Sequence, residues 1–294
     1  MPMTLATATC VCGGVHLEAA DELPPDPRLP YPVAHPTSHG AVSRCLACGH
    51  VTIDDSHRDA ERAVGDPVAM LDRIAAFSEW WAPQLRHRTP TAIQFGAGHG
   101  RVAAALAGDG WRVRAADTSA DDVEFIRGQV GLDADLGSPD SLMGIGQFDL
   151  VVLVGMLEYE DDPGRTLSAA VRFVAPGGFV YLEVPDGDRP PGSSLVPDGL
   201  RAGQRHAFTR TSISVLVAEA GVSSLRMEHV READGRARFA VCCAVAEPAG
   251  RDDERRGMRQ IAVADPTGPA AAWAAIEDPT PAGFDSEPGP EPSA

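Results

Sequence analysis

One stretch decides the fold: Thr91-Ala92-Ile93-Gln94-Phe95-Gly96-Ala97-Gly98-His99-Gly100. The apolar residues Ile93 and Phe95 indicate the end of a buried strand. Three glycines then alternate with other residues, and the sequence of residues 101–107 (RVAAALA) is typical of a helix. In α/β sheets this order presents backbone N–H groups to a ligand at a helix N-terminus. The dinucleotide fingerprint G-x-G-x-x-G does not fit, because its third glycine position holds Arg101. The spacing favours a loop packed against a nucleoside and an amino acid, with an ordinary glycine-rich turn as the alternative.

A carboxylate ends the next predicted strand. Residues 111–116 (WRVRAA) alternate as a strand does and lead into Asp117, and Thr118 and Ser119 are typical of a helix start. An acidic residue at the end of the second strand, about 20 residues past the glycines, can accept both hydroxyls of a ribose. Asp is also a favoured helix N-cap, which is the alternative role for Asp117.

Further strands complete an α/β pattern. Residues 148–154 (FDLVVLV) form a continuous apolar run, which is typical of a central parallel strand. A Pro-Gly-Gly turn then leads into a second buried strand at residues 179–185. Two alternating segments, residues 224–231 and 236–246, flank Asp234-Gly235 and predict a hairpin.

In this order the parts resemble the class I S-adenosylmethionine-dependent methyltransferases, over roughly residues 91–246. The specific pieces are the glycine loop, Asp117, Phe148-Asp149, Leu157-Glu158-Tyr159 and Pro176-Gly177-Gly178. The resemblance implies a Rossmann-like sheet of seven strands, mostly parallel with an antiparallel last strand, and S-adenosylmethionine as the cofactor. One departure is Gln94, because the family usually has Asp or Glu there; an amide can hydrogen-bond an ammonium group but carries no charge.

The resemblance also implies which residues hold the cofactor. The glycine loop would hold the methionine part, Asp117 the ribose, and Met156 and Leu157 would lie beside the sulfonium. An acidic residue ending the third strand would contact the adenine amino group; Asp135 fits this position best, Asp133 is its rival, and capping of the following helix is the alternative for both. The predicted cofactor-binding residues are Gln94, Gly96, Ala97, Gly98, Gly100, Asp117, Thr118, Asp135, Met156 and Leu157.

Two residues are predicted to act on the methyl acceptor. Methyl transfer is an in-line displacement in which much of the catalysis is positioning, and a base is needed only if the nucleophile carries a proton. His206 is the first candidate, because His titrates near neutral pH and the family has a His-x-Phe-Thr/Ser segment here. Tyr159 stands where many relatives have His. The alternatives are a surface His beside a loop and a packed Tyr.

The sequence of residues 1–60 indicates a separate cysteine-rich module. Its second motif, Cys45-Leu46-Ala47-Cys48-Gly49, has the spacing of a zinc knuckle, whereas Cys10-Val11-Cys12 is one residue shorter. Together the motifs predict a zinc ribbon with Cys10, Cys12, Cys45 and Cys48 as ligands. A histidine could replace a badly placed cysteine, namely His16, His35, His39 or His50, and four reduced thiols without metal are the alternative. A zinc ribbon ahead of a methyltransferase core is similar to the arrangement in zinc-containing sugar C-methyltransferases of antibiotic pathways. Those enzymes have a further C-terminal domain, for which this sequence predicts no counterpart.

Composition limits the partners. The net charge of −17 argues against a general nucleic-acid or anionic-membrane binder, because both need a positive field. No apolar run approaches a membrane span and residues 1–9 lack the features of an export signal, so we expect a cytoplasmic protein without a membrane partner. The oligomeric state is left open.

The predicted organisation is a cysteine-rich module (1–60), a methyltransferase domain (61–247) and a disordered tail rich in Pro, Gly and acid (248–294). The expected function is S-adenosylmethionine-dependent methylation, at carbon or oxygen, of a small metabolite of secondary metabolism. The alternative is a catalytically inactive binding or scaffold protein with the same fold.

Overall fold

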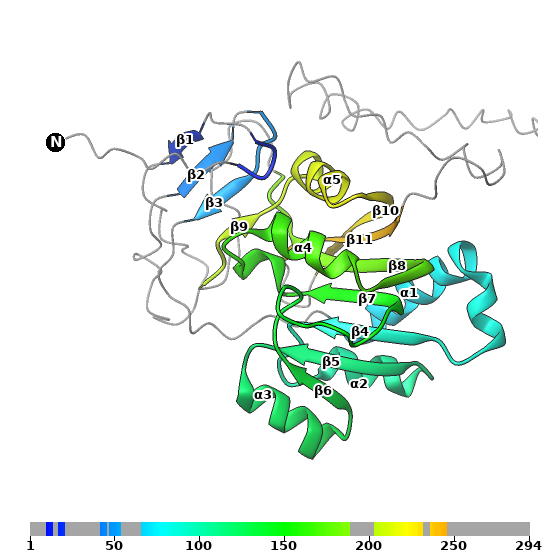
Figure 1. The fold of residues 1–294 in the computed structure, drawn as a ribbon. Coiled ribbons are helices and arrows are strands. Elements are labelled where there is room, and N and C mark those ends of the chain that lie inside the picture. Colours follow the sequence, from blue (N-terminus) through cyan, green and yellow to red (C-terminus); the bar gives the residue numbers. More distant parts are fainter. Residues whose placement is uncertain are drawn as a thin grey trace, which may run out of the picture.

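The computed structural model describes residues 10–13, 17–20, 42–45, 47–53, 66–188, 203–231 and 236–245 (Figure 1). The predicted disordered tail, most of the Pro/Gly-rich segment between residues 186 and 203, and His16, His35 and His39 lie outside these ranges. In the part of the chain that is described, no helix is long and apolar enough to cross a membrane.

A sheet of seven strands forms the body of the protein, in the order β10-β11-β8-β7-β4-β5-β6. Neighbouring strands pair in parallel from β8 to β6, and β11 is antiparallel to both β8 and β10. The predicted mostly parallel sheet with an antiparallel last strand is thus confirmed. Its strands are β4 (Thr91–Phe95), β5 (Arg112–Asp117), β6 (Asp133–Leu136), β7 (Phe148–Val154), β8 (Val174–Pro185), β10 (Val222–Arg231) and β11 (Ala237–Val245).

Helices cover both faces of this sheet because its central strands are apolar on both sides; every residue of β7 is buried. One face packs against α1 (Pro67–Trp81), α2 (Arg101–Gly108) and α3 (Ala120–Phe125). The other packs against α4 (Pro163–Val171) and α5 (Arg210–Glu219). Among the described residues there are also three short helical turns: η1 (Pro83–His87), η2 (Ile126–Val130) and η3 (Leu157–Tyr159).

The helix starts follow local sequence signals. Asp66 caps α1 by accepting a hydrogen bond from the Val68 backbone N–H at 2.9 Å, with Pro67 in the first turn. Thr209 and Ser212 form a reciprocal capping box at the start of α5. These caps fix where α1 and α5 enter the fold.

A second sheet lies beside the first and combines strands of the cysteine-rich module with one strand of the larger domain (Figure 1). Its order is β1-β2-β3-β9, all antiparallel. Three strands come from the cysteine-rich module, whereas β9 comes from the segment before α5. The bounds are β1 (Leu17–Ala20), β2 (Val42–Cys45), β3 (Val51–Ile53) and β9 (His206–Ala207). Backbone hydrogen bonds therefore join the module to the larger domain.

Candidate functional site

The glycine loop follows β4 at the carboxyl edge of the parallel strands, where α/β folds bind ligands. All three glycines have positive φ, of 63°, 51° and 73° at Gly96, Gly98 and Gly100. At Gly100 an added Cβ would lie 2.9 Å from Ile126 Cγ1, so a larger residue is excluded by space as well as by backbone conformation. At Gly98 no atom of the described residues lies within 4 Å of an added Cβ, so a ligand can approach this backbone closely.

Asp117 holds the glycine loop to the end of β5. Its side chain is buried; Oδ2 accepts a hydrogen bond from the Gly98 backbone N–H at 2.8 Å, and Oδ1 accepts one from the Ser119 N–H at 2.9 Å. Ser119, not Asp117, caps α3 by accepting from the Asp122 N–H. A carboxylate oxygen can accept a second hydrogen bond, so this position is compatible with the predicted ribose contact.

Gln94 is the last residue but one of β4 and is 2% exposed. Its amide oxygen Oε1 is buried and has no hydrogen-bond partner among the residues that the structure describes. A buried acceptor without a donor is costly, which makes such an atom a candidate contact for a ligand. The ammonium group of a methionine would supply the missing donor.

The remaining predicted cofactor residues lie around this edge. Met156 and Leu157 are buried where β7 runs into η3, Ala97 is buried in the glycine loop, and Thr118 is exposed. Asp135 is ion-paired with Arg114 of the neighbouring strand, through Nε and through Nη2 to Oδ1 at 2.9 Å. Its carboxylate is thus engaged within the sheet. The sequence analysis missed Leu136, which is 56% exposed beside Asp117 and offers an apolar surface.

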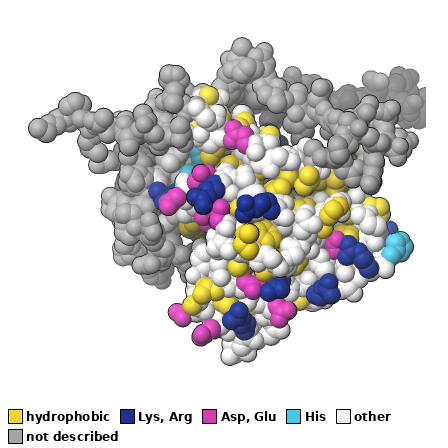
Figure 2. Space-filling model, in the orientation of Figure 1, with side chains coloured by type: hydrophobic (Ala, Val, Ile, Leu, Met, Phe, Trp, Pro, Cys, Tyr) yellow, Lys and Arg dark blue, Asp and Glu magenta, His cyan; other side chains and the backbone are white. Residues whose placement is uncertain are grey.

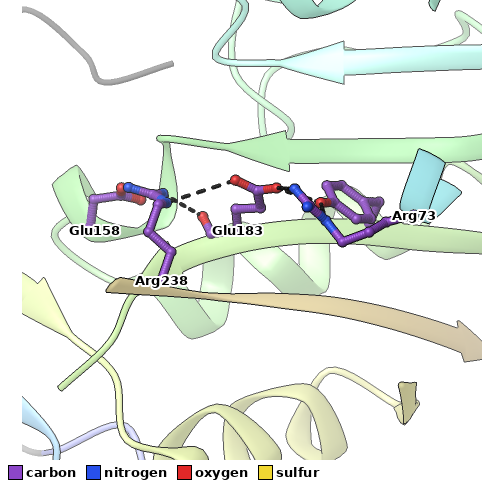
Figure 3. Close-up of polar contacts among 5 residues, drawn as sticks. Arg73, Glu158, Glu183 and Arg238 are labelled. Carbon is purple, nitrogen blue, oxygen red and sulfur yellow. Dashed lines mark hydrogen bonds and ion pairs between the residues drawn. The ribbon is translucent and has the colours of Figure 1, made fainter. Parts of the chain in front are cut away.

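A buried ionic network, also missed, follows the carboxyl ends of β7 and β8 (Figure 3). Arg238 lies between two glutamates and donates through Nη2 to Glu158 Oε1 and to the Glu183 backbone carbonyl, both at 2.8 Å. Glu183 Oε1 in turn accepts from Arg73 Nη2 at 2.7 Å and from the Tyr181 hydroxyl. Burial, reinforced by Glu183, raises the pKa of Tyr181, so its hydroxyl stays protonated. The sequence feature that could have indicated this network is a charged residue in each of two apolar runs, Glu183 in YLEV and Arg238 in RFAV.

His206, the predicted base, is 6% exposed and lies in β9. Its Nε2 is 2.9 Å from the Glu160 carbonyl oxygen, which can only accept, so Nε2 carries the proton. Its Nδ1 then accepts from His50 Nε2 at 3.0 Å, and His50 Nδ1 lies 3.4 Å from Ser212 Oγ. Both nitrogens of His206 are engaged. This placement supports a role in joining the two sheets more than the predicted role as a general base, and the half-buried Tyr159 stays a candidate.

Burial lowers the pKa of His206 from 6.5 to about 4. We expect imidazole NMR resonances of His206 to titrate near pH 4 and not near pH 6–7. The folded state binds this proton less readily than the unfolded state, so the contribution of His206 to stability falls as pH drops from 6.5 towards 4. A midpoint above pH 6 would restore His206 as the candidate base.

The four predicted cysteine ligands lie together. All four Sγ atoms are within 4.8 Å of one another, with Cys10 and Cys48 at 3.4 Å and Cys12 and Cys45 at 3.6 Å. Tetrahedral zinc with bonds of about 2.3 Å needs sulfurs about 3.8 Å apart, so the cluster fits one zinc ion. The short Cys10-x-Cys12 motif is thus compatible with a four-cysteine site, and His50 points elsewhere, to His206 and Ser212.

The cysteine-rich module is linked to the turn after β7 through Arg205. The Ile53 backbone N–H donates to the Arg205 carbonyl at 2.8 Å, and the Arg205 N–H donates to the Glu158 carbonyl at 2.7 Å. Arg205 is also ion-paired with Asp161. The segment before α5 therefore connects the cysteine-rich module to the turn that carries Leu157 and Glu158.

Comparison with known proteins agrees with this geometry. A family model described as a methyltransferase domain matches residues 60–225. The ubiquinone biosynthesis O-methyltransferase of Thiobacillus denitrificans is 32% identical over 140 residues, which cover 37% of this chain and 60% of that protein. The chain therefore matches less than two thirds of that relative's length.

The solved structures that match share little sequence with this chain. The glycopeptide N-methyltransferase MtfA is 16% identical, with a TM-score of 0.49 and coverage of 62% of this chain and 91% of that one. The 1,6-didemethyltoxoflavin-N1-methyltransferase of Burkholderia thailandensis is 19% identical, with a TM-score of 0.47 and coverage of 70% and 96%.

Proposed function

The chain belongs to the methyltransferase-domain family, and we propose that it transfers the methyl group of S-adenosylmethionine to a small-molecule acceptor. The observation that carries this proposal is the glycine loop tied to Asp117 beside a buried, unsatisfied Gln94 Oε1. Those groups match the ribose hydroxyls and the ammonium of this cofactor. Bound S-adenosylmethionine would supply a methyl group on a positively charged sulfur.

The chain's own residues would bind and orient. Asp117 would accept from the ribose, Gln94 from the ammonium, and the open backbone at Gly98 would allow close approach of the methionine part. Met156 and Leu157 would exclude water from the reacting atoms, because both are buried at the end of β7. Adenine would lie towards Asp135, with Leu136 as an apolar neighbour.

The acceptor is proposed to be a small metabolite, with methylation at carbon or oxygen in secondary metabolism. The matched relative is named an O-methyltransferase, which supports oxygen. On the face shown in Figure 2, acidic and basic side chains of the described residues are interspersed, whereas nucleic-acid binding uses a continuous basic surface. A screen of acceptor mixtures with labelled cofactor would identify the acceptor atom.

We further propose one structural zinc ion held by Cys10, Cys12, Cys45 and Cys48. The division into a module (1–60), a methyltransferase domain (61–247) and a tail (248–294), and a cytoplasmic location, remain predictions. A catalytically inactive scaffold is the competing function, and a measurement of cofactor binding separates the two.

We expect Gln94→Leu to weaken S-adenosylmethionine binding by about tenfold or more, because the ammonium loses its buried acceptor. The same variant should unfold at the same temperature as the wild type or higher, since Leu removes an unsatisfied buried polar atom. Gln94→Glu is the matched variant that keeps the acceptor and should retain binding. Calorimetry and thermal unfolding measure both effects.

Equal affinity in Gln94→Leu and the wild type would place the ammonium away from Gln94. Absence of S-adenosylmethionine and S-adenosylhomocysteine binding by the folded wild-type protein would favour the scaffold function.

A further inference from the structure

Glu158 has one carboxylate oxygen that the fold leaves unsatisfied. The side chain is 0% exposed; Oε1 accepts from Arg238, whereas Oε2 is buried and has no hydrogen-bond partner in the described part of the chain. A buried carboxylate normally has its lone pairs satisfied, because desolvation is most costly for charged groups. The missing partner of Oε2 is therefore a hydrogen-bond donor from outside the described residues, and a bound ligand can supply it.

The other glutamate of the network differs. Glu183 Oε1 accepts from both Arg73 and Tyr181, and Oε2 lies 3.9 Å from Arg238 Nε (Figure 3). Glu183 thus has a charged partner on each side. Only one end of the network, at Glu158, has a buried oxygen with no donor among these residues.

The position of Glu158 indicates which molecule supplies the donor. It directly follows Leu157, in the turn that leaves the end of β7 at the carboxyl edge of the sheet. Its backbone is held there by the Arg205 N–H. The side chain is aligned by Arg238, so the free oxygen is part of a preorganised group and not of a mobile surface side chain.

The charge balance limits the chemistry of the donor. Arg73 and Arg238 carry two positive charges and Glu158 and Glu183 two negative ones, while Tyr181 stays neutral. An additional buried ion would lack a counter-charge in this set, which is unfavourable in a desolvated site. A neutral hydroxyl or N–H group fits the unsatisfied oxygen without changing the balance.

We propose that Glu158 Oε2 binds a neutral hydroxyl or N–H group of the methyl acceptor, with Arg238 holding the carboxylate in place. This assignment rests on the proposed methyltransferase function. It makes Glu158 a residue that selects acceptors by a protic group, a role that the sequence did not predict.

Fragment binding to the full chain loaded with S-adenosylhomocysteine tests the assignment without knowledge of the natural acceptor. Phenol has a neutral hydroxyl, anisole is its ether without the donor, and benzylammonium carries a positive charge. We expect phenol to bind the wild type at least about tenfold more tightly than anisole or benzylammonium, because hydrogen bonds to charged groups contribute more than neutral ones. Ligand-observed NMR measures the three affinities.

In Glu158→Gln the preference for phenol over anisole should disappear, while the affinity for S-adenosylhomocysteine stays within about twofold. Glu158→Asp withdraws the carboxylate by one methylene and keeps its charge, so it should lose the same preference even if the Gln variant does not fold. Glu228→Gln is the control, because Glu228 lies on β10 in a partly exposed ion pair with Arg226.

Equal binding of phenol and anisole by the wild type, including no binding of either, would overturn the assignment. An unchanged preference in both Glu158 variants would overturn it as well. A large loss of S-adenosylhomocysteine affinity in these variants would assign Oε2 to the cofactor instead. If the wild type binds neither S-adenosylmethionine nor its product, the proposed function itself fails, which is a distinguishable result.

Discussion

Cys48→Ser is expected to abolish metal binding and to unfold the N-terminal ribbon. The four Sγ atoms lie within 4.8 Å of one another, and four thiolates at this distance would repel one another without a metal ion between them. Structural zinc sites supply roughly 10–16 kcal/mol of apparent binding free energy, which is also folding free energy for the small module around them. Metal analysis should find about one zinc per chain in the wild type and none in the variant.

The consequences should extend into the larger domain. Because β3 pairs with β9 and His50 contacts His206, loss of the ribbon should increase amide hydrogen exchange at Arg205 and around the turn after β7. Cys242→Ala is the matched control, since Cys242 is a buried thiol of β11 outside the cluster, and this variant should retain zinc. If wild-type protein that was produced with ample zinc contains no metal, the four cysteines are reduced thiols without a metal ion.

The sequence predicted the parts of the fold that are encoded locally. Apolar runs such as residues 148–154 and the hairpin signal at Asp234-Gly235 indicate the sheet, because strand burial and turn chemistry depend on neighbouring residues. The glycine loop and the two cysteine motifs were also visible, since each of them is defined by short-range spacing.

The features that were missed depend on contacts between distant segments. Strand β9 is only two residues long and exists because β3 pairs with it, so no local pattern marks it. His50 contacts His206 and so determines its environment. The register between β5 and β6 determines that Asp135 pairs with Arg114. The sequence therefore suggested a general base or a surface His at position 206, whereas His206 is buried in β9.

The buried ionic network shows the same dependence on distant contacts. Glu158, Glu183 and Arg238 come from three segments, and each alone is a charged residue in an apolar run. Only the neighbouring positions of β8 and β11 and the turn after β7 bring them together. Their burial predicts that a single substitution in the network lowers stability strongly.

Arg238→Met is expected to reduce the free energy of unfolding by about 3–5 kcal/mol, because it leaves a buried carboxylate without its charged partner. Arg238 is 3% exposed and Glu158 is 0% exposed, so solvent cannot replace the lost interaction. Denaturant unfolding monitored by circular dichroism measures the change. Arg226→Met is the matched control on the adjacent strand: its ion pair with Glu228 is half-exposed and should contribute less than about 1 kcal/mol.

The double variant Arg238→Met/Glu158→Leu separates the stability cost of the unpaired Glu158 charge from the cost of lost packing around Arg238. If the loss arises from the uncompensated Glu158 carboxylate, removing that carboxylate as well should recover part of the stability. A loss that stays the same in the double variant would attribute it to the Arg238 contact with the Glu183 carbonyl and to packing. A loss below about 1 kcal/mol in Arg238→Met would contradict the prediction, because removing one partner of a buried pair leaves an uncompensated charge.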